Sequence, residues 1–170
     1  FSLSANIFGR KSISNSTNIR EILGSSTPSF LNTINNSTSN GSFNFYRAGL
    51  DYLPDNRNSF SFYGSVSQGG SLSSGNQIID SVRESLVKSF LLDNNSNFDY
   101  LNKGAQLSFK HLFAEPGHEV TADFNYNEAS NDSWSTINSS YLNQRSIGVG
   151  NNKNYTTNID YAREFKNAVK

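Results

Sequence analysis

The segment from Ser108 to Asn127, SFKHLFAEPGHEVTADFNYN, constrains the fold more than any other part of the chain. Apolar and polar residues alternate on both sides of a Pro-Gly pair, and a period of two is typical of β-strands with one apolar and one polar face. Pro116 and Gly117 favour a tight turn between the two runs. The segment therefore predicts an antiparallel β-hairpin whose two faces meet different surroundings.

The same alternation recurs along the chain and predicts six strands. In FYRAGLDY, for example, Tyr46, Ala48 and Leu50 share one face, while Arg47 and Asp51 lie on the other. The predicted strands cover residues 2–11, 43–54, 58–68, 98–113, 119–129 and 153–165. Each is about as long as a tilted strand must be to cross a bilayer. The final AVK is interpreted as the start of a seventh strand.

Short and long connections alternate between these predicted strands. The short ones lie at Pro54, Pro116 and Lys166. The long ones are rich in Asn, Ser and Gly and cover residues 12–42, 69–97 and 130–152. An up-and-down meander with turns at one rim and loops at the other produces this alternation. We therefore expect each strand to pair with its sequence neighbours and the three short turns to share one rim.

One long connection contains the apolar segment IIDSVRESLVKSFLL, residues 78–92. Ile78, Val82 and Leu86 fall near helical spacing, whereas Val82, Glu84 and Leu86 also fit an extended ribbon. The pattern favours neither interpretation over the other. A small helix over a barrel mouth and an extension of the flanking strands are both consistent with it.

The residue types on the two faces indicate what surrounds the sheet. Soluble sheets carry Lys and Glu on their exposed faces, which discourages edge-to-edge pairing. Here only 16% of residues are charged, and the polar faces consist mainly of Ser, Thr, Asn and Asp. Lys103 and Arg163 fall on the apolar side, toward the predicted strand ends, where a long cation can reach water. These features favour a membrane barrel with a hydrated lumen over a soluble sandwich.

Composition also limits the chemistry. The chain has 14 basic and 14 acidic residues, so nucleic acid is not an expected partner. It has no cysteine, which excludes disulfides and thiolate metal ligands. The only histidines, His111 and His118, flank the Pro-Gly turn with Glu115 and Glu119 nearby. We interpret them as turn and interface residues rather than metal ligands.

No catalytic constellation stands out in the sequence. Asp51, Asp123 and Asp160 share the polar side and are interpreted as lumen-lining residues rather than as paired acids for glycoside hydrolysis. Trp134 falls with Tyr141 in a predicted loop, where it either stacks on a sugar or a partner surface or holds the loop by packing. The sequence thus predicts no catalytic, cofactor-binding or metal-binding residue, and the chain is not expected to be an enzyme.

Three segments carry a resemblance to a known family: FYRAGLDYLPDNRNSFSFYGSVS, LSFKHLFAEPGHEVTADFNYN and NYTTNIDYAREFKNAVK. The strand motif G-x-D-Y, the turn F-x-x-P-G-H-E and a D-Y strand before a short turn follow one another in this order. In this the chain resembles successive hairpins of the outer-membrane β-barrels of TonB-dependent receptor-like proteins. The resemblance implies an internal segment of a longer receptor, although neither a plug domain nor an energy-coupling box is recognisable.

These observations predict an all-β chain in which residues 1–170 form one segment of a transmembrane barrel built as an antiparallel meander. The expected location is the cell outer membrane, and the expected function is uptake or passage of a solute. Expected partners are membrane lipid, an unidentified solute, the rest of a larger barrel and an energy-coupling protein. No cofactor is expected. The alternative is a soluble all-β binding or adhesion module that recognises carbohydrate or a protein partner.

Overall fold

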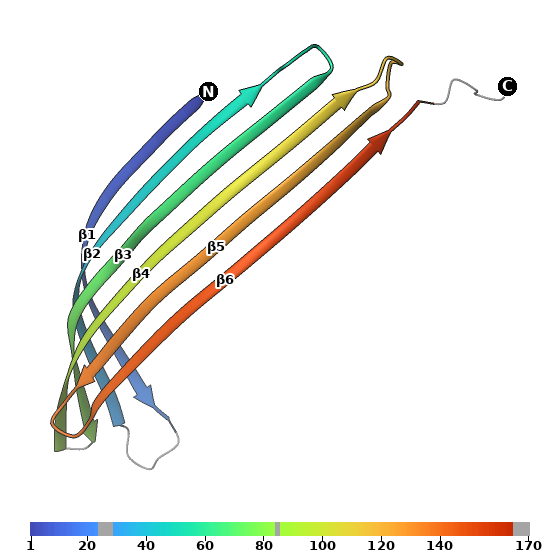
Figure 1. Ribbon diagram of the computed structural model, residues 1–170. Coiled ribbons are helices and arrows are strands. Elements are labelled where there is room, and N and C mark those ends of the chain that lie inside the picture. Colours follow the sequence, from blue (N-terminus) through green and yellow to red (C-terminus); the bar gives the residue numbers. More distant parts are fainter. Residues whose placement is uncertain (24–28, 84–85, 165–170) are drawn as a thin grey trace.

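The computed structural model describes residues 1–23, 29–83 and 86–164, and all regular structure in these ranges is β-strand. The strands are β1 (Ser2–Ile22), β2 (Ser29–Tyr52), β3 (Asn58–Arg83), β4 (Leu86–Leu112), β5 (Glu119–Asn138) and β6 (Asn143–Ala162). They form one antiparallel sheet in the order β1-β2-β3-β4-β5-β6, so every strand pairs with its sequence neighbour (Figure 1). The predicted all-β antiparallel meander is confirmed.

The strands are much longer than the sequence pattern indicates. They contain between 20 and 27 residues, and their pairing continues through most of the three predicted long connections. The prediction of loops over residues 12–42, 69–97 and 130–152 was therefore wrong. Asn, Ser and Gly are depleted in strands on average, but cross-strand hydrogen bonds over the whole length override that weak preference here.

The described residues of the segment 78–92 are extended, as one of its two interpretations requires. Ile78 lies opposite Leu91 and Val82 opposite Val87, so the two halves of the segment form the distal end of the β3–β4 hairpin. A helix over these residues is excluded at the positions that the structure describes. The apolar residues meet across the strands and need no helical stripe.

The two short turns that the structure describes lie at the same end of the sheet. Figure 1 shows the β2–β3 and β4–β5 connections together at the upper end, which we call the turn rim, and the start of β1 near them. The end of β1, the end of β3 and the β5–β6 turn lie at the opposite end. The prediction for Pro54 and Pro116 is confirmed, whereas Lys166 and the proposed seventh strand lie outside the described residues.

Asp55 organises the turn between β2 and β3. One carboxylate oxygen accepts hydrogen bonds from the backbone N–H groups of Arg57, at 2.7 Å, and Asn58, at 2.8 Å. The Asn58 side-chain amide also donates to both carboxylate oxygens. The Asn58 amide, followed by the Arg57 N–H, lowers the pKa of Asp55 from its usual value of 3.8, because these donors stabilise the charged form.

The turn between β4 and β5 has the geometry that its Pro-Gly pair predicts. The His118 N–H donates to the Glu115 carbonyl at 3.2 Å, and Gly117 has a φ of 71°. Pro at the second position and Gly with positive φ at the third define a type II turn. This local chemistry fixes the register of the hairpin on either side.

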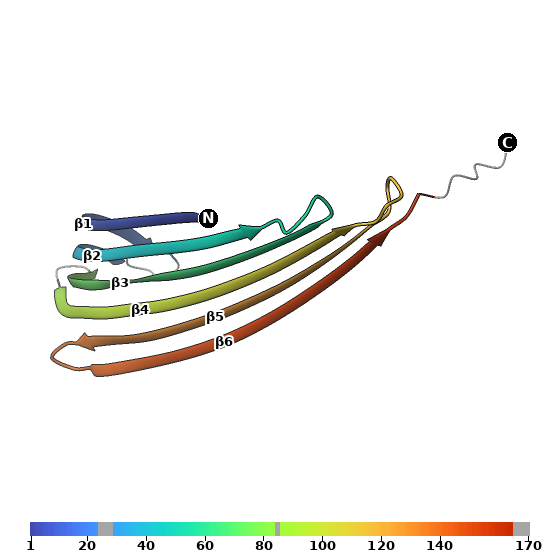
Figure 2. The ribbon, with the colours of Figure 1, turned by 45° about the horizontal axis from the view of Figure 1, so that its top comes forward.

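The sheet is a single curved layer, and nothing in the described residues packs against either face (Figure 2). No large apolar side chain of the described chain is buried; Leu3 is 77% exposed and Ile159 71% exposed. Within these ranges there is also no helix long and apolar enough to span a membrane. An apolar surface of this extent is rare on a soluble monomer and marks contact with lipid or another layer.

Candidate functional site

The turn-rim half of the sheet carries an apolar surface on one face, which we call the apolar strip. Its members lie directly opposite one another in the strand register, as in the row Leu50, Phe62, Leu107 and Phe124. The strip comprises Leu3, Ala5 and Ile7 on β1, Tyr46, Ala48, Leu50 and Tyr52 on β2, Phe60, Phe62, Gly64 and Val66 on β3, Ala105, Leu107 and Phe109 on β4, Val120, Ala122, Phe124 and Tyr126 on β5, and Tyr155, Thr157, Ile159 and Tyr161 on β6.

Aromatic side chains mark the border of the strip at the turn rim. The ring centroid of Phe60 lies 4.8 Å from that of Phe109 and 6.4 Å from that of Tyr52. Phe113 stacks on His118 at 3.9 Å and lies 6.4 Å from Tyr161. These contacts form an aromatic cluster at the turn-rim end of the strip.

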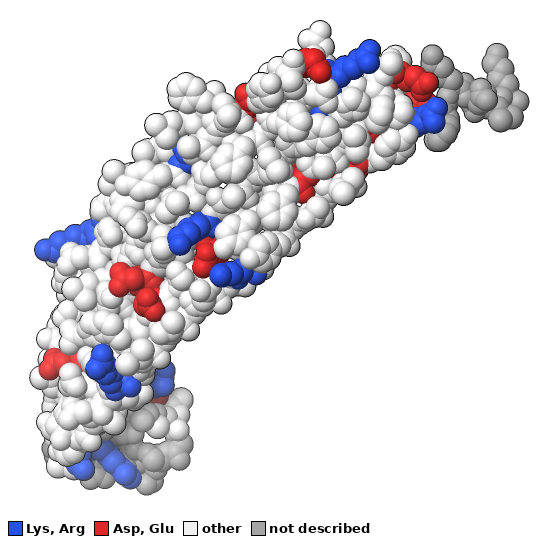
Figure 3. Space-filling view, viewed as in Figure 1, with Lys and Arg blue, Asp and Glu red and all other residues white. Residues whose placement is uncertain are grey.

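Charged residues mark the other border. Lys103 of β4 lies opposite Glu128 of β5, which in turn lies opposite Lys153 of β6. The expectation that Lys103 falls near a strand end was wrong, because β4 continues far beyond it. Arg163 does follow the end of β6, 3.5 Å from Glu115 at the turn rim. Figure 3 shows one face of the molecule, on which charged side chains are few and gather in small groups.

On the opposite face of this half of the sheet the side chains are polar and hydrogen-bond to one another. We call this surface the polar lining. Asp51 accepts hydrogen bonds from the hydroxyls of Ser61, at 2.7 Å, and Tyr63, at 2.8 Å. Ser108 donates in the same way to Asp123 on the next strand. The polar lining comprises Arg47, Gly49 and Asp51 on β2, Ser61, Tyr63 and Ser65 on β3, Gly104, Gln106 and Ser108 on β4, Asp123, Asn125 and Asn127 on β5, and Asn154, Thr156 and Asn158 on β6.

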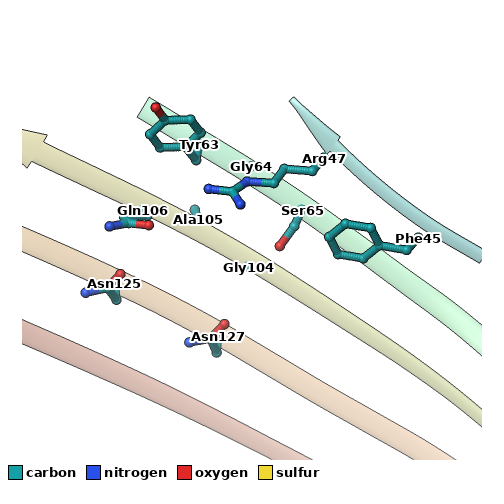
Figure 4. Close-up of a pocket in the computed structure, with 10 residues that line it drawn as sticks. All are labelled: Phe45, Arg47, Tyr63, Gly64, Ser65, Gly104, Ala105, Gln106, Asn125 and Asn127. Carbon is teal, nitrogen blue, oxygen red and sulfur yellow. The ribbon is translucent and has the colours of Figure 1, made fainter. Parts of the chain in front are cut away.

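A shallow hollow of about 230 Å³ lies on the polar lining (Figure 4). The Arg47 guanidinium lies 4.8 Å from the centroid of the Tyr63 ring, a cation–π arrangement. Gln106, Asn125 and Asn127 line the hollow from β4 and β5. The hollow thus offers amide groups and one cation to water or to a passing polar solute, without a nucleophile held beside a base.

Two glycines accommodate tyrosine rings on the polar lining side. Tyr63 lies directly opposite Gly49, and a Cβ added at Gly49 would lie only 2.2 Å from that ring. Tyr100 lies opposite Gly69 in the same manner, 2.9 Å from the position of an added Cβ. An aromatic ring that covers a glycine on the neighbouring strand shields its backbone and fixes the register. These contacts join residues on neighbouring strands, so the sequence alone does not reveal them.

The three predicted lining carboxylates lie on one face, as expected. Asp51 and Asp123 share one row, separated by Ser61 and Ser108, so they are roughly 14 Å apart at the usual strand spacing. Paired carboxylates of glycosidases are about 5–9.5 Å apart. Asp160 lies in the adjacent row, opposite Thr121. The carboxylates are thus spread over the polar lining. Asp51 and Asp123 are too far apart to act as the paired acids of a glycosidase.

The two histidines have separate partners. His111 Nδ1 lies 2.7 Å from the Asn58 side-chain oxygen, whereas His118 Nε2 lies 2.8 Å from the Tyr161 hydroxyl. Of the two nearby glutamates, Glu119 pairs with Lys110 at 2.7 Å, and Glu115 lies 3.9 Å from His118 Nδ1. The described residues contain no group of three metal-ligating side chains.

Trp134 and Tyr141 do not form a joint surface. Trp134 lies within β5, opposite Asn97 and Ile147, and is not in a loop. Tyr141 lies in the β5–β6 turn, with its ring centroid 6.0 Å from that of Phe90. The prediction that Trp134 lies in a loop with Tyr141 was therefore wrong.

The distal half of the sheet contains rows of like polar residues that the sequence did not reveal. Six serines lie side by side across all six strands in one row: Ser12, Ser39, Ser73, Ser96, Ser135 and Ser146. On the other face, a second row consists of Asn15, Asn36, Asn76, Asp93, Asn138 and Asn143. The Asn36 amide donates to Asn76 at 3.2 Å. Both faces are therefore polar along these two rows, whereas the end of the β3–β4 hairpin is apolar.

Comparisons with known proteins show no family for this chain. No family model matches it, and no curated protein matches it. Among solved structures, the membrane pore complex of pneumolysin shows 10% sequence identity over 92% of this chain, with a TM-score of 0.16. The chain spans 31% of the length of that protein. A similarity this low carries no argument about fold or function.

Proposed function

We propose that this chain forms part of the wall of a transmembrane β-barrel in the cell outer membrane, through which a solute is taken up or passes. The observation that carries the proposal is the difference between the two faces of the same rows. The apolar strip consists of exposed aromatic and aliphatic groups, and the polar lining behind it consists of hydrogen-bonded hydroxyls, amides and carboxylates. Lipid on one side and a hydrated lumen on the other satisfy both faces.

The lengths of the strands support a sheet that continues beyond the bilayer. Between Tyr46 and Tyr52 the apolar strip covers seven residues of β2, roughly 20 Å along the strand. β4 contains 27 residues, about two to three times the 9–11 residues of a membrane crossing. The distal half, with its rows of Ser and Asn, then projects into water on the side opposite the turn rim. In outer-membrane barrels short turns face the periplasm.

The edges of the sheet support a larger assembly. In the described chain β1 pairs only with β2, and β6 only with β5, so each outer strand has one unpaired edge. Unpaired backbone groups cannot lie within hydrocarbon, and the smallest membrane barrels have about eight strands. Further strands of a longer receptor would close the barrel, in line with the resemblance to TonB-dependent receptor-like proteins. Energy coupling would then come from a separate protein.

The alternative of a soluble carbohydrate-binding module has less support. It requires a second layer over the apolar strip and an aromatic platform for sugar. The described residues form one layer, and Trp134 and Tyr141 lie apart. We therefore retain the barrel as the proposed function.

The test is the behaviour of the full-length protein in detergent. A closed barrel is expected to partition into the detergent phase and to migrate faster on a gel before boiling than after it, because detergent alone does not unfold it. A monodisperse monomer that stays in solution without detergent would overturn the proposal.

A further inference from the structure

A trough crosses the apolar strip over β2, β3 and β4. Its floor is formed by the small residues Ala48, Gly64 and Ala105, which lie directly opposite one another. Its walls are the larger side chains Leu3, Tyr46, Phe62, Val66 and Tyr126. The trough encloses about 480 Å³, and a Cβ added at Gly64 would meet no atom within 4 Å. A volume of this size is within the range of small-molecule sites.

Two cationic residues line this apolar trough, Arg47 and Lys103. The Arg47 guanidinium lies over the Tyr63 ring on the polar lining, 4.8 Å from its centroid, so Lys103 is the cation on the apolar face. Lys103 contributes to its lining at the border of the strip, opposite Val66 and Glu128. The Glu128 carboxylate accepts a hydrogen bond from the Tyr126 hydroxyl at 2.8 Å and lies 3.8 Å from the Lys153 ammonium. Glu128 is thus held by Tyr126, a wall of the trough, and by Lys153, and its charge also attracts Lys103 on the neighbouring strand. Lys103 presents positive charge next to the apolar trough.

We propose that the trough binds one anionic lipid, with an acyl chain along the floor at Gly64 and the headgroup at Lys103. This inference rests on the proposed membrane location and adds a specific lipid to it. A cation at the end of an apolar channel is complementary to an amphiphile with an acidic head, because the chain covers the channel while the headgroup pairs with the ammonium. A zwitterionic lipid would fill the channel equally well but would gain less at Lys103.

The test uses native mass spectrometry of the full-length protein in nonionic detergent, titrated with either phosphatidylglycerol or phosphatidylcholine. We expect one retained phosphatidylglycerol, bound about fivefold more tightly than phosphatidylcholine, which is the gain expected for a single lysine near an anionic headgroup. Equal retention of the two lipids, or a broad series of adducts without one dominant species, would overturn the proposal.

Two pairs of variants locate the site. Gly64→Leu fills the floor and should lower retention of both lipids, whereas Gly9→Leu should not. Gly9 is on the same face, outside the trough, and also has open space around an added Cβ. Lys103→Gln should remove the preference for phosphatidylglycerol, whereas Lys153→Gln, in the same row but outside the trough, should leave it intact. Equal effects within either pair would contradict the assignment.

The outcome is separable from that of the proposed function. If the protein shows heat-dependent gel mobility but retains no lipid, only the lipid site is wrong. If the protein stays soluble without detergent, the membrane location itself fails and the lipid site fails with it.

Discussion

Replacing Phe124 by Arg tests which side of the sheet meets lipid. Phe124 lies near the middle of the apolar strip, opposite Leu107 and Thr157, and is 40% exposed in the sheet alone. An aromatic side chain has roughly 150–250 Å² to bury, so about 60–100 Å² of Phe124 remains for contact with lipid. At about 25 cal/mol per Å², that contact stabilises the folded protein by roughly 1.5–2.5 kcal/mol.

Phe124→Arg forfeits this contact and adds the cost of a charge in hydrocarbon. Arg near the midplane of a barrel costs roughly 2–4 kcal/mol, so with the lost contact we expect the free energy of unfolding to fall by roughly 3.5–6.5 kcal/mol. The assay is reversible urea unfolding of the full-length protein in lipid vesicles. Asn125→Arg is the matched control, because the next residue on β5 lies in the polar lining and lines the hollow there. Its cost should stay below about 1 kcal/mol, the range of exposed substitutions.

Equal destabilisation by Phe124→Arg and Asn125→Arg would refute the reasoning, since it would mean that both faces are packed against protein. Negligible destabilisation by both variants would refute it as well, because the apolar strip would then face water.

Three further predictions concern the turn rim and the polar lining. Gly49→Val should destabilise by about 1–3 kcal/mol in the same assay, because its Cβ would displace the Tyr63 ring, whereas Gly64→Val, with open space around its Cβ, should not. Gly117→Ala should cost about 1–2 kcal/mol, because a φ of 71° disfavours residues with a Cβ; an unchanged unfolding midpoint would contradict this. The pKa of Asp55 is lowered from its usual value of 3.8, so its carboxylate stabilises the folded state at any pH above 3.8. This contribution disappears as the pH falls below 3.8 and through the lowered pKa of the folded state. The stability difference between the wild type and Asp55→Ala should therefore be constant at neutral pH and shrink in acid; a difference that grows in acid would contradict the assignment.

The turn-rim half of the fold could be predicted from the sequence because two independent signals agree there. Apolar and polar residues alternate strictly on either side of Pro54 and Pro116, and each proline begins a turn whose chemistry is local. The period-two pattern and the turn residues together determine where the strands lie, which strands pair, and which side chains share a face. That Phe124 and Asp123 lie on opposite faces of the sheet follows from their being consecutive residues of one strand.

Much of the distal half could not be predicted because both faces are polar along its rows of Ser and Asn. With Ser and Asn on each face, the period-two signal vanishes and the composition resembles that of a loop. Its order depends on partners far away in the chain, such as Ser39 opposite Ser73, and the sequence carries no sign of that register. The contact of Tyr63 with Gly49 could not be predicted for the same reason, because it joins residues on two different strands.

The most direct test of the membrane location is a spin-label scan of β5 in the full-length protein reconstituted in vesicles. Residues 1–170 contain no cysteine, so single cysteines can be introduced from Val120 to Asn127 without removing any from this segment. Labels at Val120, Ala122, Phe124 and Tyr126 should be accessible to oxygen, which concentrates in lipid, whereas labels at the alternate positions should be accessible to a polar nickel complex. Nickel accessibility at every position, or equal protection of both sets, would contradict a sheet with lipid on one face and water on the other.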